Sequence, residues 1–458
     1  MRKAPDLIRG FSYIFVLMKF SVLPGFDQQA FRKYLKNTGW LFLARVGSLG
    51  IKILAGIAVA NYLGKTANGM LNYPLVFVTF FLAAAALGLD GFITRELLSE
   101  PEKKNKLLGT AFRMRLVAGI AIIPLSWLTY LLFKGDSGDV PVSYILIASC
   151  IGITQSLSII DSYFQSRVQG KYVMMVQVTG NLLSAGIKLI LILISAPLSW
   201  FIWTLLIDAA ILGIGYLIVY KARGNHTPEW EYEETLAKYL LKHSWPLAFS
   251  AILVTVYMKI GQLMVESFLG VGALGIYSTV VNWSESWYFI PVAIVTSVFP
   301  AIMNARRDDP SRYQKRLSDM YDLMVSISLS IALVMSFASV YIYRYFYAAE
   351  FAEGAKILSI HIWAGVFVFL GSASGQYLVA EGYTRYSLYR TAAGAVVNVV
   401  LGFFWIPLYG LQGAAFATLI AYFSATFFIL VFPETRKQGI NMLKSLFLIS
   451  IIQKIVKR

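Results

Sequence analysis

Long stretches of apolar residues constrain this chain more than any other feature. We identify twelve of them, at 40–62, 72–89, 116–133, 142–163, 173–194, 199–220, 245–267, 273–303, 322–346, 358–380, 389–406 and 413–432. A helix needs about 20 apolar residues to cross a hydrocarbon core of about 30 Å. The chain is also 58% hydrophobic and only 14% charged, against roughly 45–50% and 25% in soluble domains. We therefore predict an all-α polytopic membrane protein with about 12 transmembrane helices, which excludes a soluble enzyme, a disordered chain and a fibre.

Two further apolar stretches are too short or too charged to count as spans. Residues 11–20 contain Lys19, and residues 442–452 contain Lys444. Both are typical of amphipathic helices that lie in the membrane interface. The second could also insert as an extra span, and the sequence leaves that alternative open.

The distribution of basic residues predicts the orientation of the chain. With a cytoplasmic N-terminus, 32 of the 40 Lys and Arg residues fall on the inner side and 4 on the outer side. Basic residues concentrate in cytoplasmic loops, so both termini are expected in the cytoplasm. The net charge of +16 is spread over every inner loop rather than gathered in one patch, which argues against a nucleic-acid partner. The single cysteine, Cys150, and three scattered histidines favour neither a disulfide nor a metal site.

An internal repeat divides the chain into two halves. The sequence Lys33-Tyr34-Leu35, Trp40, Leu63-Gly64 and Gly69 recurs as Lys238-Tyr239-Leu240, Trp245, Leu269-Gly270 and Gly275. Each half holds six spans and enters the membrane in the same direction, so a pseudo-two-fold axis along the membrane normal is expected, with a cavity between two bundles. The predicted segments are an N-terminal interfacial segment (1–39), two six-helix bundles (40–220 and 245–432), a cytoplasmic linker (221–244) and a basic amphipathic tail (433–458).

Polar residues recur at helical spacing in four of the predicted spans. The stripes are Arg45, Ser48 and Lys52 in span 1; Gln177, Asn181, Ser184 and Lys188 in span 5; Thr255, Lys259, Gln262 and Glu266 in span 7; and Ser278, Asn282 and Glu285 in span 8. Each set lies on one helical face. Because the stripes come from both halves, they predict one shared hydrated cleft. Asp208 is a further deep acid, whereas Arg45, Asp90 and Asp161 lie near inner helix ends and Glu266 lies near an outer end.

Charged groups at the bilayer centre are costly and normally face a cavity or a partner. One interpretation is that Arg45, Lys52, Lys188 and Lys259 receive an anionic substrate, most plausibly phosphate. The other is that they form internal ion pairs with the nearby acids. Arg45 and Lys52 share a face without an acid between them, which favours a ligand. Lys259 and Glu266 share a face two turns apart, which favours their coupling to each other.

Several short segments are similar to one known family. The step Leu63-Gly64 to Gly69, the segments His361-Ile362-Trp363-Ala364 and Leu378-Val379-Ala380-Glu381-Gly382, and Ile406-Pro407-Leu408-Tyr409-Gly410 leading into Gly413-Ala414-Ala415 resemble Wzx-type polysaccharide flippases of the MOP (multidrug/oligosaccharidyl-lipid/polysaccharide) superfamily. The resemblance covers residues 30–435 and implies a fold like that of the MATE transporters.

The resemblance implies a function in cell-surface polysaccharide biosynthesis. Members flip undecaprenyl-pyrophosphate-linked oligosaccharides across the bacterial inner membrane by alternating access. The expected partners are this lipid-linked substrate, membrane lipids, a polysaccharide polymerase and a chain-length regulator. No cofactor is expected beyond a proton or sodium gradient, for which Asp208, Glu285 and Glu266 are the coupling candidates. Trp283 and Trp287 could stack on sugar rings, or else serve ordinary packing.

Two other functions stay open. A multidrug exporter of the same superfamily should prefer an acidic cavity for cationic drugs, and the embedded cations argue against it. An integral-membrane glycan polymerase or ligase should carry a large outer loop with catalytic groups, and every outer loop here is short. The sequence contains no phosphate-binding Gly-rich loop or nucleophile elbow, so ATP hydrolysis is not expected.

Overall fold

The computed structural model describes residues 28–134 and 139–450. Helices account for nearly all of this part of the chain, which contains no strand. The predicted interfacial helix at 11–20 lies outside the described residues. The N-terminal half comprises α2 (Gln28–Ala85), α3 (Leu89–Ser99), α4 (Lys104–Lys134), α5 (Val142–Ser149), α6 (Ile151–Gln155), α7 (Ile159–Ser166), α8 (Gly170–Leu193) and α9 (Leu198–Ala222).

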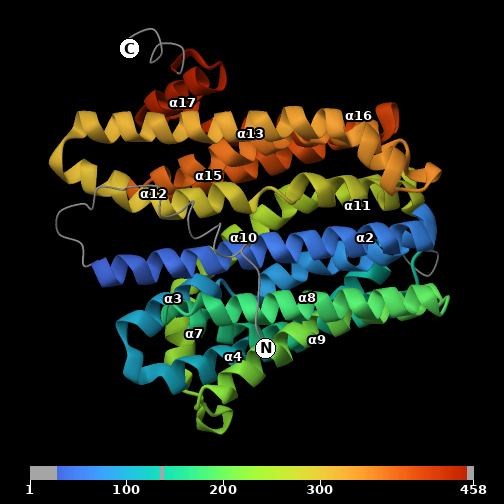
Figure 1. The fold of residues 1–458 in the computed structure, drawn as a ribbon, viewed down its shortest axis with the longest axis horizontal. Helices are drawn as coiled ribbons and strands as arrows, with labels where there is room; N and C mark the ends of the chain where they lie inside the picture. The colour runs from blue at the N-terminus through green and yellow to red at the C-terminus, as the bar shows by residue number, and fades with distance from the viewer. Residues whose placement is uncertain (1–27, 135–138, 451–458) are drawn as a thin grey trace, which may run out of the picture.

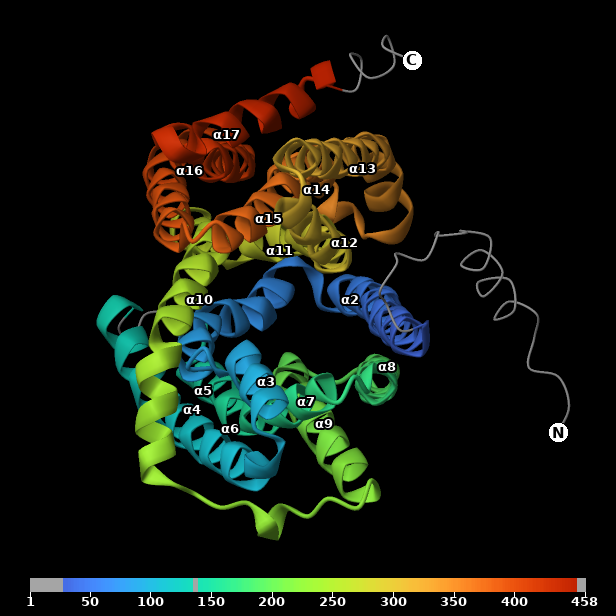
Figure 2. The ribbon, with the colours of Figure 1, turned by 90° about the vertical axis from the view of Figure 1, so that its left-hand side faces the viewer.

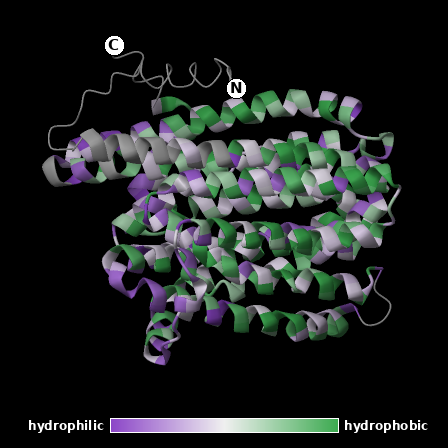
Figure 3. Ribbon diagram, turned by 60° about the horizontal axis from the view of Figure 1, so that its bottom comes forward, coloured by the Kyte–Doolittle hydropathy of each residue, from purple (hydrophilic) through white to green (hydrophobic). Residues whose placement is uncertain are grey.

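The C-terminal half repeats this pattern of long helices. It comprises α10 (Glu234–Leu269), α11 (Val271–Glu285), α12 (Phe289–Asp308), α13 (Pro310–Phe346), α14 (Gly354–His361), α15 (Ala364–Ala380), α16 (Thr384–Phe427) and α17 (Pro433–Leu446). The helices run roughly parallel along the longest axis (Figure 1). Apolar residues dominate along their length, and hydrophilic residues gather towards the ends (Figure 3). This distribution is the one that a bilayer requires of a bundle.

Eight of the described helices are long and apolar enough to cross a membrane, or nine if the bent pair Ala349–His361 and Ala364–Ala380 forms one span. This number is smaller than twelve chiefly because two of the long helices each hold two of the predicted spans. α2 is broken at Gly64, and α16 is broken at Gly410; both glycines have φ values of 60–75° that suit a residue without a side chain. The predicted span 273–303 is divided between α11 and α12, which do not qualify by this test.

The helices form two groups that are visible when the molecule is viewed along its long axis (Figure 2). Helices α2–α9 belong to one group and α10–α16 to the other, and α2 and α10 lie between the groups and contact both. We call them the N-terminal bundle and the C-terminal bundle. α17 packs on α13 at the edge of the C-terminal bundle. Its 14 residues span only about 21 Å at 1.5 Å per residue, too short to cross the membrane.

Different turns and connections lie at the two ends of the bundles. One end holds the turns near Gly64, Gly270 and Phe346, which the charge bias predicts to lie on the outer side. The other holds the connection between α9 and α10 and the turns after α3 and α15. We call these the outer end and the inner end, after the predicted orientation. α10 begins at Glu234, well before the predicted span at 245, because a helix continues beyond the bilayer wherever no residue stops it.

Candidate functional site

Two lysines of the N-terminal bundle lie near one carboxylate within its membrane-spanning part, and Arg45 lies near one of these lysines. The Lys188 Nζ on α8 lies 2.6 Å from the Asp208 Oδ2 on α9. Lys52 on α2 interacts electrostatically with Asp208, Lys188 and Arg45, so its side chain is turned towards α8 and α9. We call Arg45, Lys52, Lys188 and Asp208 the cation cluster. The structure thus brings together the polar stripes predicted on spans 1 and 5.

Small polar residues support the cation cluster. The Lys188 Nζ also donates to the Ser184 Oγ at 3.1 Å, and Ser184 and Asn181 are buried on the same face of α8. Ser48 is buried between Arg45 and Lys52 on α2, and its Oγ has no hydrogen-bond partner among the described residues. The Asp208 Oδ1 is likewise buried without one. Buried polar atoms without partners are uncommon and mark positions where a ligand or water can bind.

The charges of the cluster do not cancel. Arg45, Lys52 and Lys188 contribute three positive charges. Asp208 contributes one negative charge, and Asp161 on α7, which interacts with Arg45, contributes a second. Among the described residues, no carboxylate lies within ion-pair distance of Arg45 or Lys52, and both side chains are exposed in the bundle. An excess positive charge that water or a ligand can reach suits the binding of an anion.

The C-terminal bundle holds a separate ion pair. The Lys259 Nζ on α10 lies 2.6 Å from the Glu285 Oε2 on α11, and both side chains are about one-quarter exposed or less. The expected coupling of Lys259 to Glu266 is therefore wrong. Glu266 instead pairs with Lys134 at the end of α4, at 2.8 Å, because the neighbouring bundle approaches that turn of α10 closely.

The other candidate residues of the C-terminal bundle have different environments. Gln262 is buried, and Asn282 is exposed. The Trp283 Nε1 donates to the Tyr347 Oη at 3.1 Å, whereas the Trp287 Nε1 is buried without a partner in the described chain. Both tryptophans pack partly buried against the apolar core. No described contact joins these residues to the cation cluster, so a single cleft shared by all four stripes stays a prediction.

The two copies of the internal repeat meet at the outer end. A Cβ added to Gly69 would lie 1.8 Å from the Val271 carbonyl oxygen, and one added to Gly275 would lie 1.8 Å from the Lys65 carbonyl oxygen. Only glycine permits this approach. Each copy begins at a glycine of nearly identical backbone geometry, with φ 75° and ψ 168° at Gly64 and φ 84° and ψ 171° at Gly270. We call this contact the glycine crossing.

Polar contacts between the bundles hold the outer end closed around the glycine crossing. The Asn68 Nδ2 donates to the Gly275 carbonyl oxygen at 2.9 Å in a buried position. The Asn61 side chain accepts from the Ala348 N–H at 2.9 Å and donates to the Phe346 carbonyl oxygen at 2.7 Å. The buried carboxylate of Glu266 pairs with Lys134. These contacts join the two bundles at the outer end.

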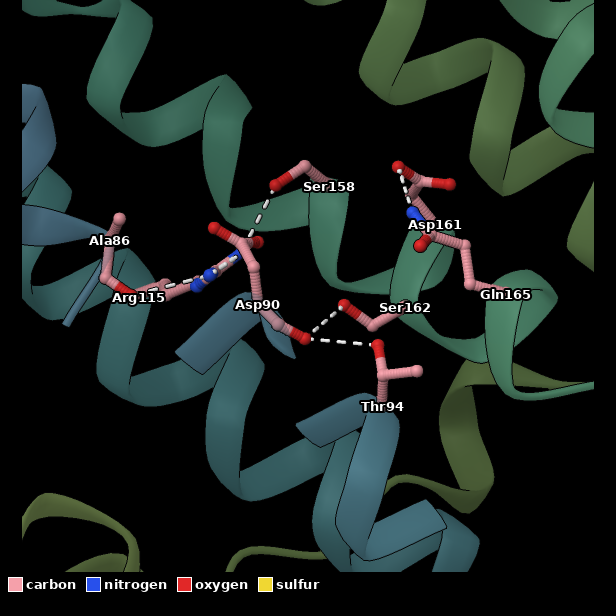
Figure 4. Close-up of polar contacts among 8 residues, drawn as sticks. All are labelled: Ala86, Asp90, Thr94, Arg115, Ser158, Asp161, Ser162 and Gln165. Atoms are coloured by element: carbon pink, nitrogen blue, oxygen red, sulfur yellow. Dashed lines mark hydrogen bonds and ion pairs between the residues drawn. The ribbon is translucent and has the colours of Figure 1, made fainter. Parts of the chain in front are cut away.

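A third polar network lies near the inner end of the N-terminal bundle (Figure 4). The Arg115 guanidinium, only 2% exposed, donates to the Asp90 carboxylate at 2.7 Å, to the Ser158 Oγ at 3.1 Å and to the Ala86 carbonyl oxygen at 3.2 Å. Sequence reasoning missed this centre because Arg115 directly precedes a predicted span and counted as a loop residue.

Comparison with known proteins shows the family. The model of a family described as polysaccharide biosynthesis protein matches residues 34–306, more than half of the chain, and the MatE model matches residues 246–404. The capsular polysaccharide biosynthesis protein CapF of Staphylococcus aureus is 22% identical over 85% of this chain and 97% of its own length. An uncharacterized membrane protein of Methanocaldococcus jannaschii, MJ1375, is 23% identical over 88% of this chain and 98% of its own.

Solved structures show the same fold. An inward-facing multidrug resistance MATE transporter of the MOP superfamily superposes with a TM-score of 0.68 at 12% identity, covering 87% of this chain and 96% of its own. An outward-facing MATE structure gives 0.63. The lipid II flippase MurJ, in an inward closed conformation, gives 0.66 at 18% identity, covering 92% and 93%. The chain is a multi-pass membrane protein of the polysaccharide biosynthesis protein family, and it has the fold of the MOP transporters, as its resemblance to them predicted.

Proposed function

We propose that this protein moves a polyprenyl-pyrophosphate-linked oligosaccharide from the inner to the outer leaflet by alternating access. The observation that carries the proposal is the excess positive charge of the cation cluster within the membrane-spanning part of the N-terminal bundle. A pyrophosphate is the anionic part of such a lipid. Arginine offers it a planar fork of donors, and lysine offers a compact charge.

The closed outer end supports the direction of transport. With the outer end held by the glycine crossing and the Lys134–Glu266 pair, a substrate from the inner leaflet would load first. Release on the outer side then requires these contacts to separate. Asp208, Glu285 and Glu266 stay candidates for coupling to a proton or sodium gradient, since each carboxylate pairs with a lysine and its protonation would weaken that pair.

The experiment is a flipping assay in liposomes. The protein is reconstituted with a fluorescent polyprenyl-pyrophosphate oligosaccharide, and the fraction that becomes accessible to an added quencher is followed over time. Lys52→Gln is the test variant. Loss of a hydrogen bond to a charged group costs about 1.5–3 kcal/mol, so we expect the substrate concentration at half-maximal rate to rise about ten- to one-hundred-fold.

Lys171→Gln is the matched control because Lys171 is an exposed lysine in the first turn of α8, away from the cluster. Its removal should leave the rate unchanged. Absence of flipping by the unmodified protein would refute the proposal. Equal flipping rates for Lys52→Gln and Lys171→Gln would show that the cation cluster does not bind the substrate during flipping.

A cation exporter is the second candidate, favoured by the MatE match over residues 246–404. It predicts that a cationic dye leaves loaded vesicles, and that Lys52→Gln does not slow its exit. The same liposomes loaded with dye in place of labelled lipid decide between the two functions.

A further inference from the structure

Arg390 places a permanent positive charge inside the C-terminal bundle. Its guanidinium extends from the second turn of α16 to α15, where Nη1 donates to the Ser374 Oγ at 2.6 Å and Nη2 donates to the Gly371 carbonyl oxygen at 3.0 Å. Gly375 leaves room for it, since a Cβ there would lie 3.0 Å from Nη2. Gly371 is about 13 Å along the helix from the inner end of α15 at 1.5 Å per residue. The guanidinium therefore points towards α15 and away from the inner end of that helix.

The charge of Arg390 has no acidic partner among the described residues. Its two acceptors are a hydroxyl and a backbone carbonyl, and the ionisable groups that act on it are the phenols of Tyr257 and Tyr321. Four other cations each have a carboxylate within 2.8 Å: Arg115 with Asp90, Lys134 with Glu266, Lys188 with Asp208, and Lys259 with Glu285. Within the described chain, Arg390 shares its lack of a carboxylate partner with Arg45 and Lys52 of the cation cluster. Arginine cannot lose its proton in a protein, so this part of the bundle carries an unbalanced positive charge.

The surroundings of Arg390 are rich in donors and poor in acceptors. Tyr321 on α13 is fully buried, and its hydroxyl has no hydrogen-bond partner among the described residues. Of the five N–H donors of the guanidinium, two make the bonds to α15. Arg390 as a whole is half-buried, and its other three donors have no protein acceptor among the described residues.

A purely structural role does not account for this arrangement. A neutral glutamine could donate to Ser374 and Gly371 without the cost of placing a charge in the membrane. Nor would packing explain a buried hydroxyl of Tyr321 without an acceptor. An anion with several oxygens would satisfy both groups at once.

We propose that Arg390, together with the Tyr321 hydroxyl, binds a phosphate group of the lipid-linked substrate in the C-terminal bundle. This proposal rests on the proposed function and extends it, since it adds a second anion site in the opposite bundle from the cation cluster. The pyrophosphate could then contact both bundles during one transport cycle. The guanidinium would bind two phosphate oxygens through its planar fork.

The test measures binding of farnesyl pyrophosphate, a soluble short-chain prenyl pyrophosphate, through its effect on thermal unfolding of the purified full-length protein in detergent. All variants are made in the Lys52→Gln background, which weakens binding at the cation cluster. Arg390→Gln should raise the apparent Kd by tenfold or more, and Arg390→Lys by less. Tyr321→Phe should raise it severalfold, and this variant keeps the test decisive if Arg390→Gln does not fold.

Arg385→Gln is the matched control because Arg385 is an exposed arginine on the same helix, and its Kd should be unchanged. Farnesol, which lacks the phosphates, should give no shift. Unchanged binding in both Arg390→Gln and Tyr321→Phe would overturn the proposal. Equal competition by phosphatidylglycerol would assign the site to a phospholipid headgroup and overturn the assignment to the substrate.

The outcome is separable from that of the proposed function. Binding that depends on Arg390 in a protein that flips no lipid would leave the anion site standing and refute the transport proposal. Flipping by the unmodified protein and by Arg390→Gln, with the same dependence on substrate concentration, would refute the anion site alone.

Discussion

Replacing Gly275 with alanine should open the outer end of the molecule. The added Cβ would lie 1.8 Å from the Lys65 carbonyl oxygen, whereas ordinary contacts begin at 3.4 Å. The two helices must therefore separate by about 1.6 Å. That movement would stretch the buried bond from the Asn68 Nδ2 to the Gly275 carbonyl oxygen, now 2.9 Å, to about 4.5 Å, beyond the range of a hydrogen bond.

The expected magnitude follows from the loss of this bond. A buried polar group left without a partner costs about 1–3 kcal/mol, which corresponds to a roughly 5- to 150-fold change in the ratio of closed to open molecules. Replacing glycine by alanine also stabilises the helix itself by about 1 kcal/mol, because alanine has the higher helix propensity. Gly272→Ala on the same helix gains the same propensity, but its Cβ makes ordinary contacts, with the Thr66 Oγ1 at 3.4 Å and the Lys65 Cγ at 4.0 Å. The difference between the two variants isolates the glycine crossing.

The assay measures how fast a membrane-impermeant maleimide labels a cysteine at Val271, which is 6% exposed. Cys150, the only native cysteine, is first replaced by serine. Gly275→Ala should raise the labelling rate at Val271→Cys about 5- to 150-fold, and Gly272→Ala should leave it unchanged. Equal rates for the two variants would refute the view that the glycine crossing closes the outer end.

Three further predictions concern single contacts. Glu266→Gln and Lys134→Met should each lower the melting temperature in detergent, because breaking a buried pair costs about 3–5 kcal/mol. A double variant in which the two charged residues are exchanged should recover part of the lost melting temperature. Arg115→Lys should reduce the yield of folded protein in size-exclusion chromatography, since lysine cannot supply the fork that binds three acceptors. Hydrogen bonds from Ser311 hold the pKa of Asp309 below its usual value, so its stabilisation of α13 is present at neutral pH and is lost as the pH falls through the folded-state pKa. The melting temperature should therefore fall as the pH is lowered through this pKa, and Asp309→Ala should abolish that part of its pH dependence.

The membrane fold could be predicted because the bilayer dictates helix length and composition, and both are visible in the sequence. The internal repeat was visible for a related reason. Gly64 and Gly270 have positive φ values that favour glycine, and Gly69 and Gly275 lie too close to the opposite backbone for a Cβ, so the same spacing of glycines occurs in both halves. The break between α11 and α12 just before Pro291 agrees with the general effect of proline on helices.

The pairing of the charges could not be predicted in the same way. Helical spacing places Lys259 and Glu266 on one face of α10, but it does not say which neighbouring helix approaches that face at each level. Glu285 and Lys134 are the actual partners, and both come from elements whose position depends on the packing of whole bundles. Arg390 stands at the second position of the predicted span 389–406 and was counted among the inner basic residues, since only the approach of α15 shows which groups its guanidinium contacts.

The glycine crossing has the form of an isologous interface contained within one chain. In a two-fold homodimer, residue i of one subunit meets residue j of the other, and j meets i. Here Gly69 meets Val271, and Gly275 meets Lys65, with both pairs of equivalent positions separated by the same interval. Two identical subunits would have to carry every substitution twice. In a single chain the copies can differ, and they do: Asn68 donates to the opposite backbone, whereas the equivalent position holds Leu274, buried in the core. One half can therefore supply the polar contact of the closed state while the other supplies its apolar packing.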